Sequence, residues 1–346
     1  MFIRNAWYVG AWGHELTSAP IARRLLNEPV VLFRDAEGRA AVLEDRCCHR
    51  GVPLSLGTVT QKGLKCGYHG LIFDANGVCV EVPGQTRIPE RAKVKSYRVV
   101  ERDEFVWVWM GDPAQAREDQ IINWPYNNDY KNWPHKHTMM PVSCNYKYLL
   151  ENLMDLSHIG HVHTKTIGSG ADENLKVRMK VERTETGVKF SRWMLDIVAA
   201  PTFAKAGNFK GNVDRWQEFE FVGPSSILHY SGAIDSGSDQ EKREGGVKNR
   251  LFHAITPETD SSCMYFWCVA NGQQTDNPAA TDFLFEQVRM TFAEDLIFVE
   301  TQQNRLTDYD KGKLVDIESD SARIQLNRFI DRMEANENLR ASEAAE

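Results

Sequence analysis

Two short segments that combine cysteine and histidine carry the most specific chemistry in this sequence. The first reads C-C-H over residues 47–49, and the second reads C-G-Y-H over residues 66–69. A set of four cysteines would indicate a plant-type iron–sulfur cluster or a zinc ribbon. Two thiolates and two imidazoles favour a Rieske [2Fe–2S] centre, in which histidines replace the cysteines on one iron. The candidate ligands are Cys47, His49, Cys66 and His69.

A second group of histidines lies about a hundred residues further on. His158, His161 and His163 fall within six residues, and Asp155 precedes them. A helix over this segment would place Asp155 and His158 on one face. Two imidazoles and one carboxylate form the facial triad of non-haem Fe(II) oxygenases, which leaves coordination positions open for dioxygen. A hydrogen-bonded structural cluster is the alternative, and the upstream electron carrier favours the metal.

The carboxylate of such a triad must come from another element. Asp295 is our candidate, because it lies in a largely apolar segment where an unpaired acid would be costly to bury. Glu294 and Glu300 are its competitors, and by spacing alone any of the three could be a surface acid.

The elements that would position these residues can be outlined from periodicity. Residues 1–112 alternate short β-rich runs with turns, and both cysteine–histidine segments lie among them. Residues 145–160 indicate a helix, residues 175–270 return to strands, and two more helices are expected over 279–309 and 317–343. The longer one carries apolar residues near one stripe, at Phe283, Val288, Phe292, Leu296 and Val299. A turn-rich segment after Gly111 predicts two domains, 1–113 and 114–346.

Composition limits the class of protein. The chain has 346 residues, of which 42% are hydrophobic and 26% charged, as in an ordinary globular protein. Neither a membrane-length apolar run nor a secretory h-region is visible, so we expect a cytoplasmic protein. Seven scattered cysteines argue against a disulfide framework, and a net charge of −7 argues against nucleic acid as a partner.

The charge is unevenly distributed along the chain. Residues 46–98 contain nine Lys or Arg and three acidic residues, a local balance of +6. This stretch could dock an acidic electron donor, and a solvated surface without a role is the alternative.

The whole chain resembles the oxygenase components of Rieske non-haem iron oxygenases. The resemblance includes R-N-A-W-Y over residues 4–8, the two cysteine–histidine segments, N-L-M-D over 152–155 with the histidines that follow, and the late Glu-Asp pair. It is strongest to the branch with vanillate and dicamba O-demethylases and toluenesulfonate methyl-monooxygenase, which residues 253–259 also resemble. It implies an α+β protein with an all-β Rieske domain, followed by a helix-grip (START-like) catalytic domain with an antiparallel sheet and long helices.

The resemblance also implies roles for individual residues. Cys47 and Cys66 would bind one cluster iron, and His49 and His69 the other. His158, His163 and Asp295 would bind a mononuclear Fe(II). Asp155 would be a catalytic bridge between a ligand histidine and a cluster histidine of a neighbouring subunit, which is why this branch typically forms homotrimers. Asn152 matches a residue close to the iron. The family often has proline where Cys48 stands, and His161 matches no ligand.

The implied activity is that of a terminal oxygenase, fed by a separate NAD(P)H-dependent reductase or ferredoxin. It would monooxygenate a small anionic aromatic, either by O-demethylation of a methoxybenzoate or by hydroxylation of an aryl methyl group. His229 and His253, isolated on predicted strands, would bind the anionic group, or else be ordinary core histidines. The alternatives are a ring cis-dihydroxylating dioxygenase of the phthalate type and, without enzymatic activity, a Rieske electron carrier or a zinc-binding module.

Overall fold

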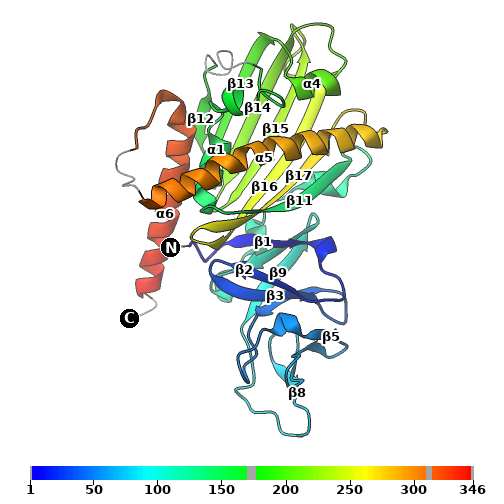
Figure 1. Ribbon diagram of the computed structural model, residues 1–346, viewed down its shortest axis with the longest axis vertical. Helices are drawn as coiled ribbons and strands as arrows, with labels where there is room; N and C mark the ends of the chain where they lie inside the picture. Colours follow the sequence, from blue (N-terminus) through cyan, green and yellow to red (C-terminus); the bar gives the residue numbers. More distant parts are fainter. Residues whose placement is uncertain (1, 170–176, 309–313, 344–346) are drawn as a thin grey trace. The chain divides into compact units, whose positions relative to one another are not determined.

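The computed structural model describes residues 2–169, 177–308 and 314–343, and the chain divides into two compact units. The first unit comprises residues 1–123 and 256–260, and the second comprises 124–255 and 261–346. The expected α+β class, with strands alone in the N-terminal part and a helix-covered sheet after it, is confirmed (Figure 1). No helix in the described ranges combines the length and apolarity that crossing a membrane requires.

The N-terminal unit is built on two antiparallel sheets. A six-stranded sheet has the order β1-β10-β9-β4-β3-β2, and a four-stranded sheet has the order β5-β6-β7-β8. Their bounds are β1 Trp7–Trp12, β2 Ile21–Leu25, β3 Glu28–Arg34, β4 Ala40–Glu44, β5 Thr58–Thr60, β6 Gly63–Lys65, β7 Ile72–Phe73, β8 Cys79–Glu81, β9 Ser96–Arg102 and β10 Phe105–Trp109.

Aromatic and β-branched residues explain why these segments are strands. All five residues of β10, F-V-W-V-W, are buried, as are all six of β1. Such side chains pack well on a pleated surface. The smaller sheet shares a hydrophobic core with β3 and β4, and that core includes Cys47 and Cys66. Both cysteines of the predicted cluster are therefore fixed by packing.

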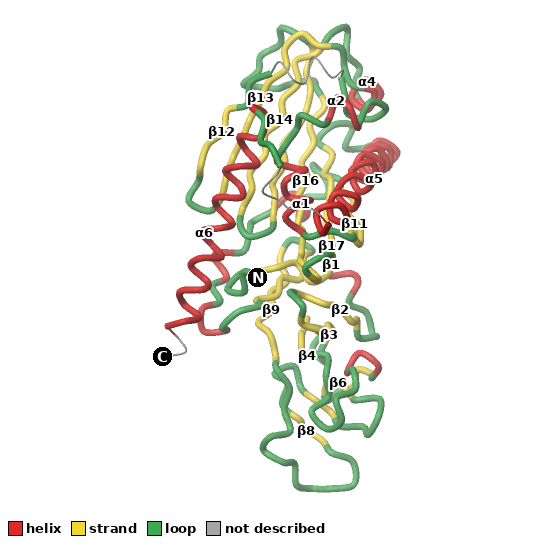
Figure 2. The backbone as a smooth tube through the Cα atoms, turned by 60° about the vertical axis from the view of Figure 1, so that its left-hand side comes forward, coloured by secondary structure: helices red, strands yellow, loops and turns green. Residues whose placement is uncertain are grey.

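The second unit is a seven-stranded antiparallel sheet with helices on one face (Figure 1, Figure 2). Its order is β11-β17-β16-β15-β14-β13-β12. The strands are β11 His135–Val142, β12 Lys180–Arg183, β13 Gly187–Ile197, β14 Val213–Val222, β15 Ser226–Asp235, β16 Val247–Thr259 and β17 Ser262–Asn271. The α-helices are α1 Tyr146–Met154, α2 Ile159–Val162, α4 Pro201–Ala206, α5 Pro278–Asp308 and α6 Ser321–Glu343.

The long helix α5 crosses the sheet and packs against β11 and β17 (Figure 2). Its buried stripe holds Leu284, Val288, Phe292 and Val299, each at most 8% exposed. Burying each of these side chains stabilises the unit by roughly 1.5–3 kcal/mol. The predicted stripe was partly wrong, since Phe283 and Leu296 are only half-buried and Leu284 takes the buried position.

The predicted helix over 145–160 is also wrong in one respect, because it is broken. The helix α1 begins after Asn145, whose side chain accepts a hydrogen bond from the Lys147 amide, and it ends at Met154. Asp155 then has extended backbone, with φ −122° and ψ 106°, so it does not share a helical face with His158. His158 instead precedes the short helix α2.

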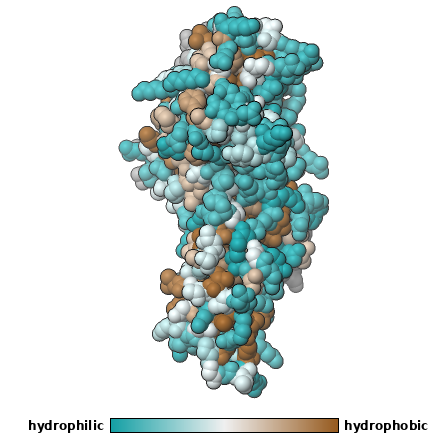
Figure 3. All heavy atoms as spheres, turned by 90° about the vertical axis from the view of Figure 1, so that its right-hand side faces the viewer, coloured by the Kyte–Doolittle hydropathy of each residue, from teal (hydrophilic) through white to brown (hydrophobic). Residues whose placement is uncertain are grey.

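The face drawn in Figure 3 is mainly hydrophilic, with apolar side chains scattered over it. Most of the large apolar residues are inside the two units. The exceptions on α5 are Met290, Ile297 and Phe298, which are 45%, 68% and 56% exposed.

Candidate functional site

The two cysteine–histidine segments form a matched pair of tight turns. The Cys47 amide donates to the Val52 carbonyl, and the Cys66 amide donates to Leu71 in the same way. In each turn a glycine four residues after the cysteine donates back to the cysteine carbonyl. Gly51 and Gly70 adopt φ values of 73° and 76°, which favour a residue without Cβ.

The four predicted cluster ligands meet at the ends of these turns. Cys47 and Cys66 are each 2% exposed, whereas His49 and His69 are exposed and their ring centroids lie 4.6 Å apart. Burial raises the pKa of the Cys47 thiol to about 11, and Cys66 beside it adds to the effect. A buried pair of thiols and an accessible pair of imidazoles fit a [2Fe–2S] cluster with one inner and one outer iron.

The second predicted ligand set also comes together, entirely within the second unit. His158 and His163 direct their Nε2 atoms at Oδ1 of Asp295, at 3.3 Å and 3.1 Å. Two ligands at right angles on one metal lie about 3 Å apart. These three residues therefore form a set that could hold a metal ion, and the donors are those of a non-haem Fe(II) site.

Asp295 occupies the buried stripe of α5 as its one acid. It is 4% exposed, and its backbone position falls between Phe292 and Val299 on the same helical face. Burial alone would raise its pKa, but hydrogen bonds from His158 and His163 outweigh burial and lower the pKa to about 2. The carboxylate is thus held ionised, as a metal ligand must be.

The competing acids have other partners. Glu294 Oε2 lies 2.8 Å from His163 Nδ1 and accepts a hydrogen bond from the Thr166 hydroxyl at 3.0 Å. Glu300 accepts from the Ser143 amide at 2.9 Å. Glu294 thus holds the far side of the His163 ring, an orienting role that metal-bound histidines commonly require.

Asn152 lies against the triad, as the sequence suggested. Its Nδ2 donates to Asp295 Oδ1 at 3.2 Å, and its Oδ1 is buried without a hydrogen-bond partner among the described residues. A buried, unsatisfied oxygen next to three metal-type ligands is consistent with a site that accepts a cation. His161 is exposed and lies outside the triad, as expected.

Asp155 is half-buried after α1. Its Oδ1 accepts a hydrogen bond from the Ser157 amide at 2.9 Å, and no hydrogen bond to His158 is present. Burial lowers the pKa of Arg192 to about 10, and the negative charge of Asp155 opposes part of this shift. The predicted bridging role of Asp155 stays a prediction.

The two histidines predicted to bind substrate are adjacent in the structure. His253 Nε2 lies 3.4 Å from His229 Nδ1, and His253 Nδ1 lies 2.7 Å from the Tyr265 hydroxyl. Burial lowers the pKa of His253 to about 3, and burial lowers that of His229 as well. Both rings are neutral, and only His229 lines the cavity beneath α5.

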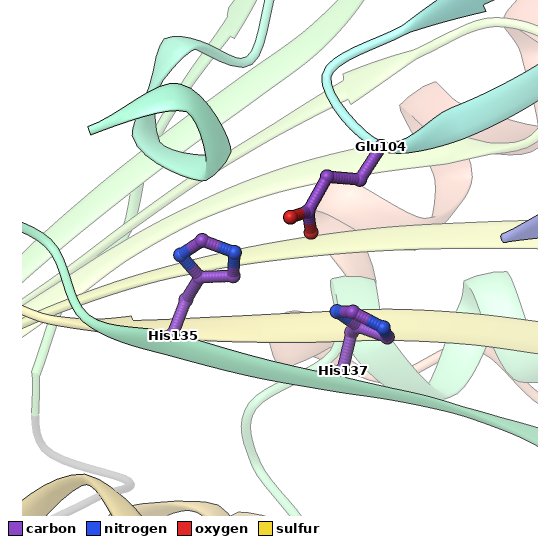
Figure 4. A group of neighbouring side chains, drawn as sticks. All are labelled: Glu104, His135 and His137. Carbon is purple, nitrogen blue, oxygen red and sulfur yellow. The ribbon is translucent and has the colours of Figure 1, made fainter. Parts of the chain in front are cut away.

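Two other histidines, His135 and His137, project from one face of β11, with ring centroids 6.4 Å apart (Figure 4). Glu104, drawn with them, belongs to the N-terminal unit. We assign no role to these residues.

Comparisons with known proteins identify the kind of domain in which each candidate ligand set lies. Residues 6–98 match the Rieske [2Fe-2S] domain, and residues 142–336 match the vanillate O-demethylase oxygenase C-terminal domain. The toluene-4-sulfonate monooxygenase system iron-sulfur subunit of Comamonas testosteroni is 36% identical, over 98% of this chain and 99% of the relative. A vanillate O-demethylase oxygenase subunit of a Pseudomonas species is 37% identical, over 99% and 98%.

The chain belongs to the oxygenase components of Rieske non-haem iron oxygenases. A crystal structure of dicamba monooxygenase bound to dicamba agrees with this assignment. It superposes with a TM-score of 0.90 at 31% identity and covers 99% of both chains. The family resemblance seen in the sequence is confirmed, and the electron-carrier and zinc-module alternatives are excluded, because the catalytic domain of the family is present.

Several residues of this oxygenase component were not singled out from the sequence. Glu294 was weighed only as a rival ligand, although its position next to Asp295 could have suggested a supporting role. Thr166 and Tyr265 carry no local signal at all. Cys48 is exposed, whereas Cys47, Cys66 and Cys79 are buried.

Proposed function

We propose that this oxygenase component inserts one oxygen atom into a small anionic aromatic substrate. For an aryl methyl ether, the product is a hemiacetal that releases formaldehyde, and for an aryl methyl group it is the alcohol. The observation that carries the proposal is the His158–His163–Asp295 set, which lies next to a cavity under α5. Support comes from relatives that are named for toluene-4-sulfonate, vanillate and dicamba.

The cavity adjoins the triad along α5. Its wall includes Thr291 and Phe292, which precede Asp295 by about one helical turn. Ile167 lies on the other side, next to Thr166, whose hydroxyl donates to Glu294. A ring held between these walls would present a substituent to the side of the triad. The apolar residues would keep bulk water away from it.

The proposed cofactors are the Rieske cluster on Cys47, His49, Cys66 and His69, and one Fe(II) on His158, His163 and Asp295. When bound, the mononuclear iron supplies oxygen activation, and the cluster supplies electrons one at a time. A dicamba monooxygenase structure named for non-haem iron, 30% identical, supports the second assignment. The protein holds Asp295 ionised and orients His163 through Glu294.

We also propose the partners and the assembly. Electrons would come from a separate reductase or ferredoxin, with NAD(P)H as their source. The chain would act in the cytoplasm as a homotrimer, in which Asp155 of one subunit faces His69 of the next. Relatives named as components or subunits of multicomponent systems support the separate donor.

Turnover with a matched reductase tests this function. Methoxybenzoates, toluates, arylsulfonates and phthalates would be screened for oxygen uptake, formaldehyde release and incorporation of label from ¹⁸O₂. We expect one labelled atom per product molecule. A cis-dihydrodiol carrying two labelled atoms would instead establish the ring dioxygenase.

A further inference from the structure

The cavity beneath α5 contains a buried arginine for which no described carboxylate provides a counter-charge. Arg215 lies on β14 and is 2% exposed. Its Nη1 donates to the Ile167 carbonyl at 2.6 Å and to the Ser169 hydroxyl at 3.3 Å. No described acid forms an ion pair with it, and its Nε is buried with no hydrogen-bond partner among the described residues. Its guanidinium carbon lies 4.6 Å from the centre of the Phe203 ring.

An unpaired charge in this position is energetically unfavourable. Burial lowers the pKa of Arg215 to about 9, and the nearby Arg192 contributes in the same direction. The group still carries its charge at neutral pH. Removing a charge from water without a partner costs several kcal/mol. Because no described residue supplies an anion here, the charge of Arg215 gives this part of the cavity a positive potential that favours an anionic ligand.

Polar groups from three neighbouring strands surround Arg215 on the same side of the sheet. Gln217 pairs with Ser231, and Ser231 pairs with Asn249, so the three form a row across β14, β15 and β16. All three line the cavity with Arg215, and each is at most 4% exposed. Gln217 accepts a hydrogen bond from Arg192 through Oε1 at 2.8 Å. Asn249 accepts a hydrogen bond from Gln273 through Oδ1 at 3.4 Å. Its Nδ2 and the Ser231 hydroxyl could therefore donate to oxygen atoms of a ligand.

The remaining wall is apolar and leads toward the triad. Leu284, Val288 and Phe292 occupy successive turns of α5, and Leu251 faces them from β16. By the 1.5 Å rise of a helix, Leu284 lies about 16 Å before Asp295 along the axis. The free volume is about 40 Å³, enough for a few water molecules, so an aromatic ring must displace side chains of α5 as it enters.

We propose that Arg215 binds the acid group of the substrate, either carboxylate or sulfonate, and so determines the preference of this oxygenase for anionic aromatics. This inference rests on the proposed function and adds the residue that provides the charge. The Nε and Nη2 hydrogens of a guanidinium are parallel and match two oxygens of such a group. Ser231 and Asn249 would complete its hydrogen bonds. His229 and His253 are neutral and would contribute hydrogen bonding and shape, rather than charge.

Equilibrium binding to the oxidised holoenzyme tests the role of Arg215 without turnover. The probes are two pairs that differ in charge, 4-methylbenzenesulfonate with its sulfonamide and 4-methoxybenzoate with its amide. We expect the wild-type protein to bind each anion roughly 10- to 100-fold more tightly than its amide. Arg215→Gln should remove this preference and leave amide affinity within about twofold, and Arg215→Lys should restore part of it.

The matched control is Arg243→Gln. This substitution also removes one positive charge near β14. Arg243 pairs with Glu218 and lies over the rings of Trp193 and Trp216, and it is not part of the cavity wall. This variant should keep the wild-type preference. If Arg215→Gln does not fold, the ratio of anion to amide affinity is compared between the wild-type protein and Arg215→Lys. A lower ratio in Arg215→Lys supports the role of Arg215, and an equal ratio contradicts it.

Three results would overturn the role of Arg215. These are equal binding of anion and amide by the wild-type protein, a preference that survives Arg215→Gln, or no binding of either anion. Turnover separates this failure from a failure of the proposed function. If the role of Arg215 fails, oxygen uptake and formaldehyde release with a neutral aryl methyl ether would still support monooxygenation. Arg215-dependent binding of anions, without oxygen uptake on any aromatic, would support the role of Arg215 and contradict the proposed monooxygenation.

Discussion

Glu294 and His163 are joined by a 2.8 Å hydrogen bond on the side of the imidazole that faces away from Asp295. The bond fixes Nδ1 as the outer nitrogen, so Nε2 is the atom that points at Asp295. Burial would lower the pKa of His163, but contacts with Asp295 and then Glu294 raise it overall. Adjacent acids on α5 therefore have different tasks, because one would bind the metal and the other orients its ligand.

Replacing Glu294 should weaken metal binding without removing a ligand. We expect Glu294→Gln to reduce the affinity for the non-cluster iron about 10- to 100-fold, the usual cost of losing such an outer partner. Titration of iron-depleted protein with Fe(II) measures this. The control is Glu300→Gln, six residues later on the same helix, where the carboxylate accepts a hydrogen bond from the Ser143 amide. Equal iron affinity in both variants would contradict the orienting role.

The two proposed metal centres should be separable by mutation. We expect Asp295→Ala to lose the mononuclear iron and keep the Rieske absorption and EPR signals, because the residues lie in different units. Cys66→Ser should lose the cluster. Iron and sulfide counts per chain check both outcomes. Loss of the cluster in Asp295→Ala would argue against two independent sites.

Asp155→Asn tests the bridging role. We expect turnover with the native reductase to fall by several orders of magnitude, while iron content and the Rieske spectrum stay unchanged. The amide keeps one oxygen for the Ser157 amide, so local structure should persist. Asp196→Asn is a control for removing an acid from the same unit. Normal turnover in Asp155→Asn would rule out the bridge.

Sequence patterns predicted which candidate ligands the structure brings together, but not the residues that surround them. Both cluster loops and the pair His158 and His163 have local spacings that reflect coordination chemistry, and Asp295 is an acid in an apolar stripe. Arg215 has no such signal. Its partners come from the segment 167–169 and from helix α4, which only the sheet and α5 bring together. The break after Met154 was missed because apolar spacing continues through it, whereas backbone conformation does not.

The buried histidines predict acid sensitivity of the catalytic unit. In the unfolded chain a histidine gains its proton near pH 6.5, whereas burial lowers the pKa of His253 to about 3 in the folded state. The unfolded state therefore binds more protons between these values. The free energy of unfolding should fall as pH decreases from 6.5 toward 3, by up to about 1.4 kcal/mol per pH unit for this residue.

Denaturant titrations at pH 7, 6 and 5 measure the slope. His253→Gln should reduce the slope of unfolding free energy against pH by up to the contribution of one proton, about 1.4 kcal/mol per pH unit. His161→Gln, at an exposed position, should leave the slope unchanged. An unchanged slope in His253→Gln would show that this ring is protonated in the folded protein.

Charge should govern the encounter with the electron donor. All nine basic residues between 46 and 98 are exposed, and six form no ion pair with a described residue: Arg50, Lys65, Arg87, Arg91, Lys93 and Arg98. We expect the second-order rate of cluster reduction to fall several-fold as ionic strength rises from about 0.01 to 0.15 M, because screening shortens the range of attraction. Charge reversal at Arg50 and Lys93 should flatten this dependence. A reduction rate that does not depend on salt would contradict docking of the electron donor on these basic residues.

The paired turns at Cys47 and Cys66 bear on how the cluster is installed. Each turn is closed by its own main-chain hydrogen bonds and by a glycine in a left-handed conformation, and each thiol is packed into the core. The two cysteine ligands therefore lose their conformational entropy when the polypeptide folds, rather than when iron and sulfide bind. Iron and sulfide would then enter a site that the folded chain already shapes, and the buried Cys47 thiol must lose its proton when it binds iron.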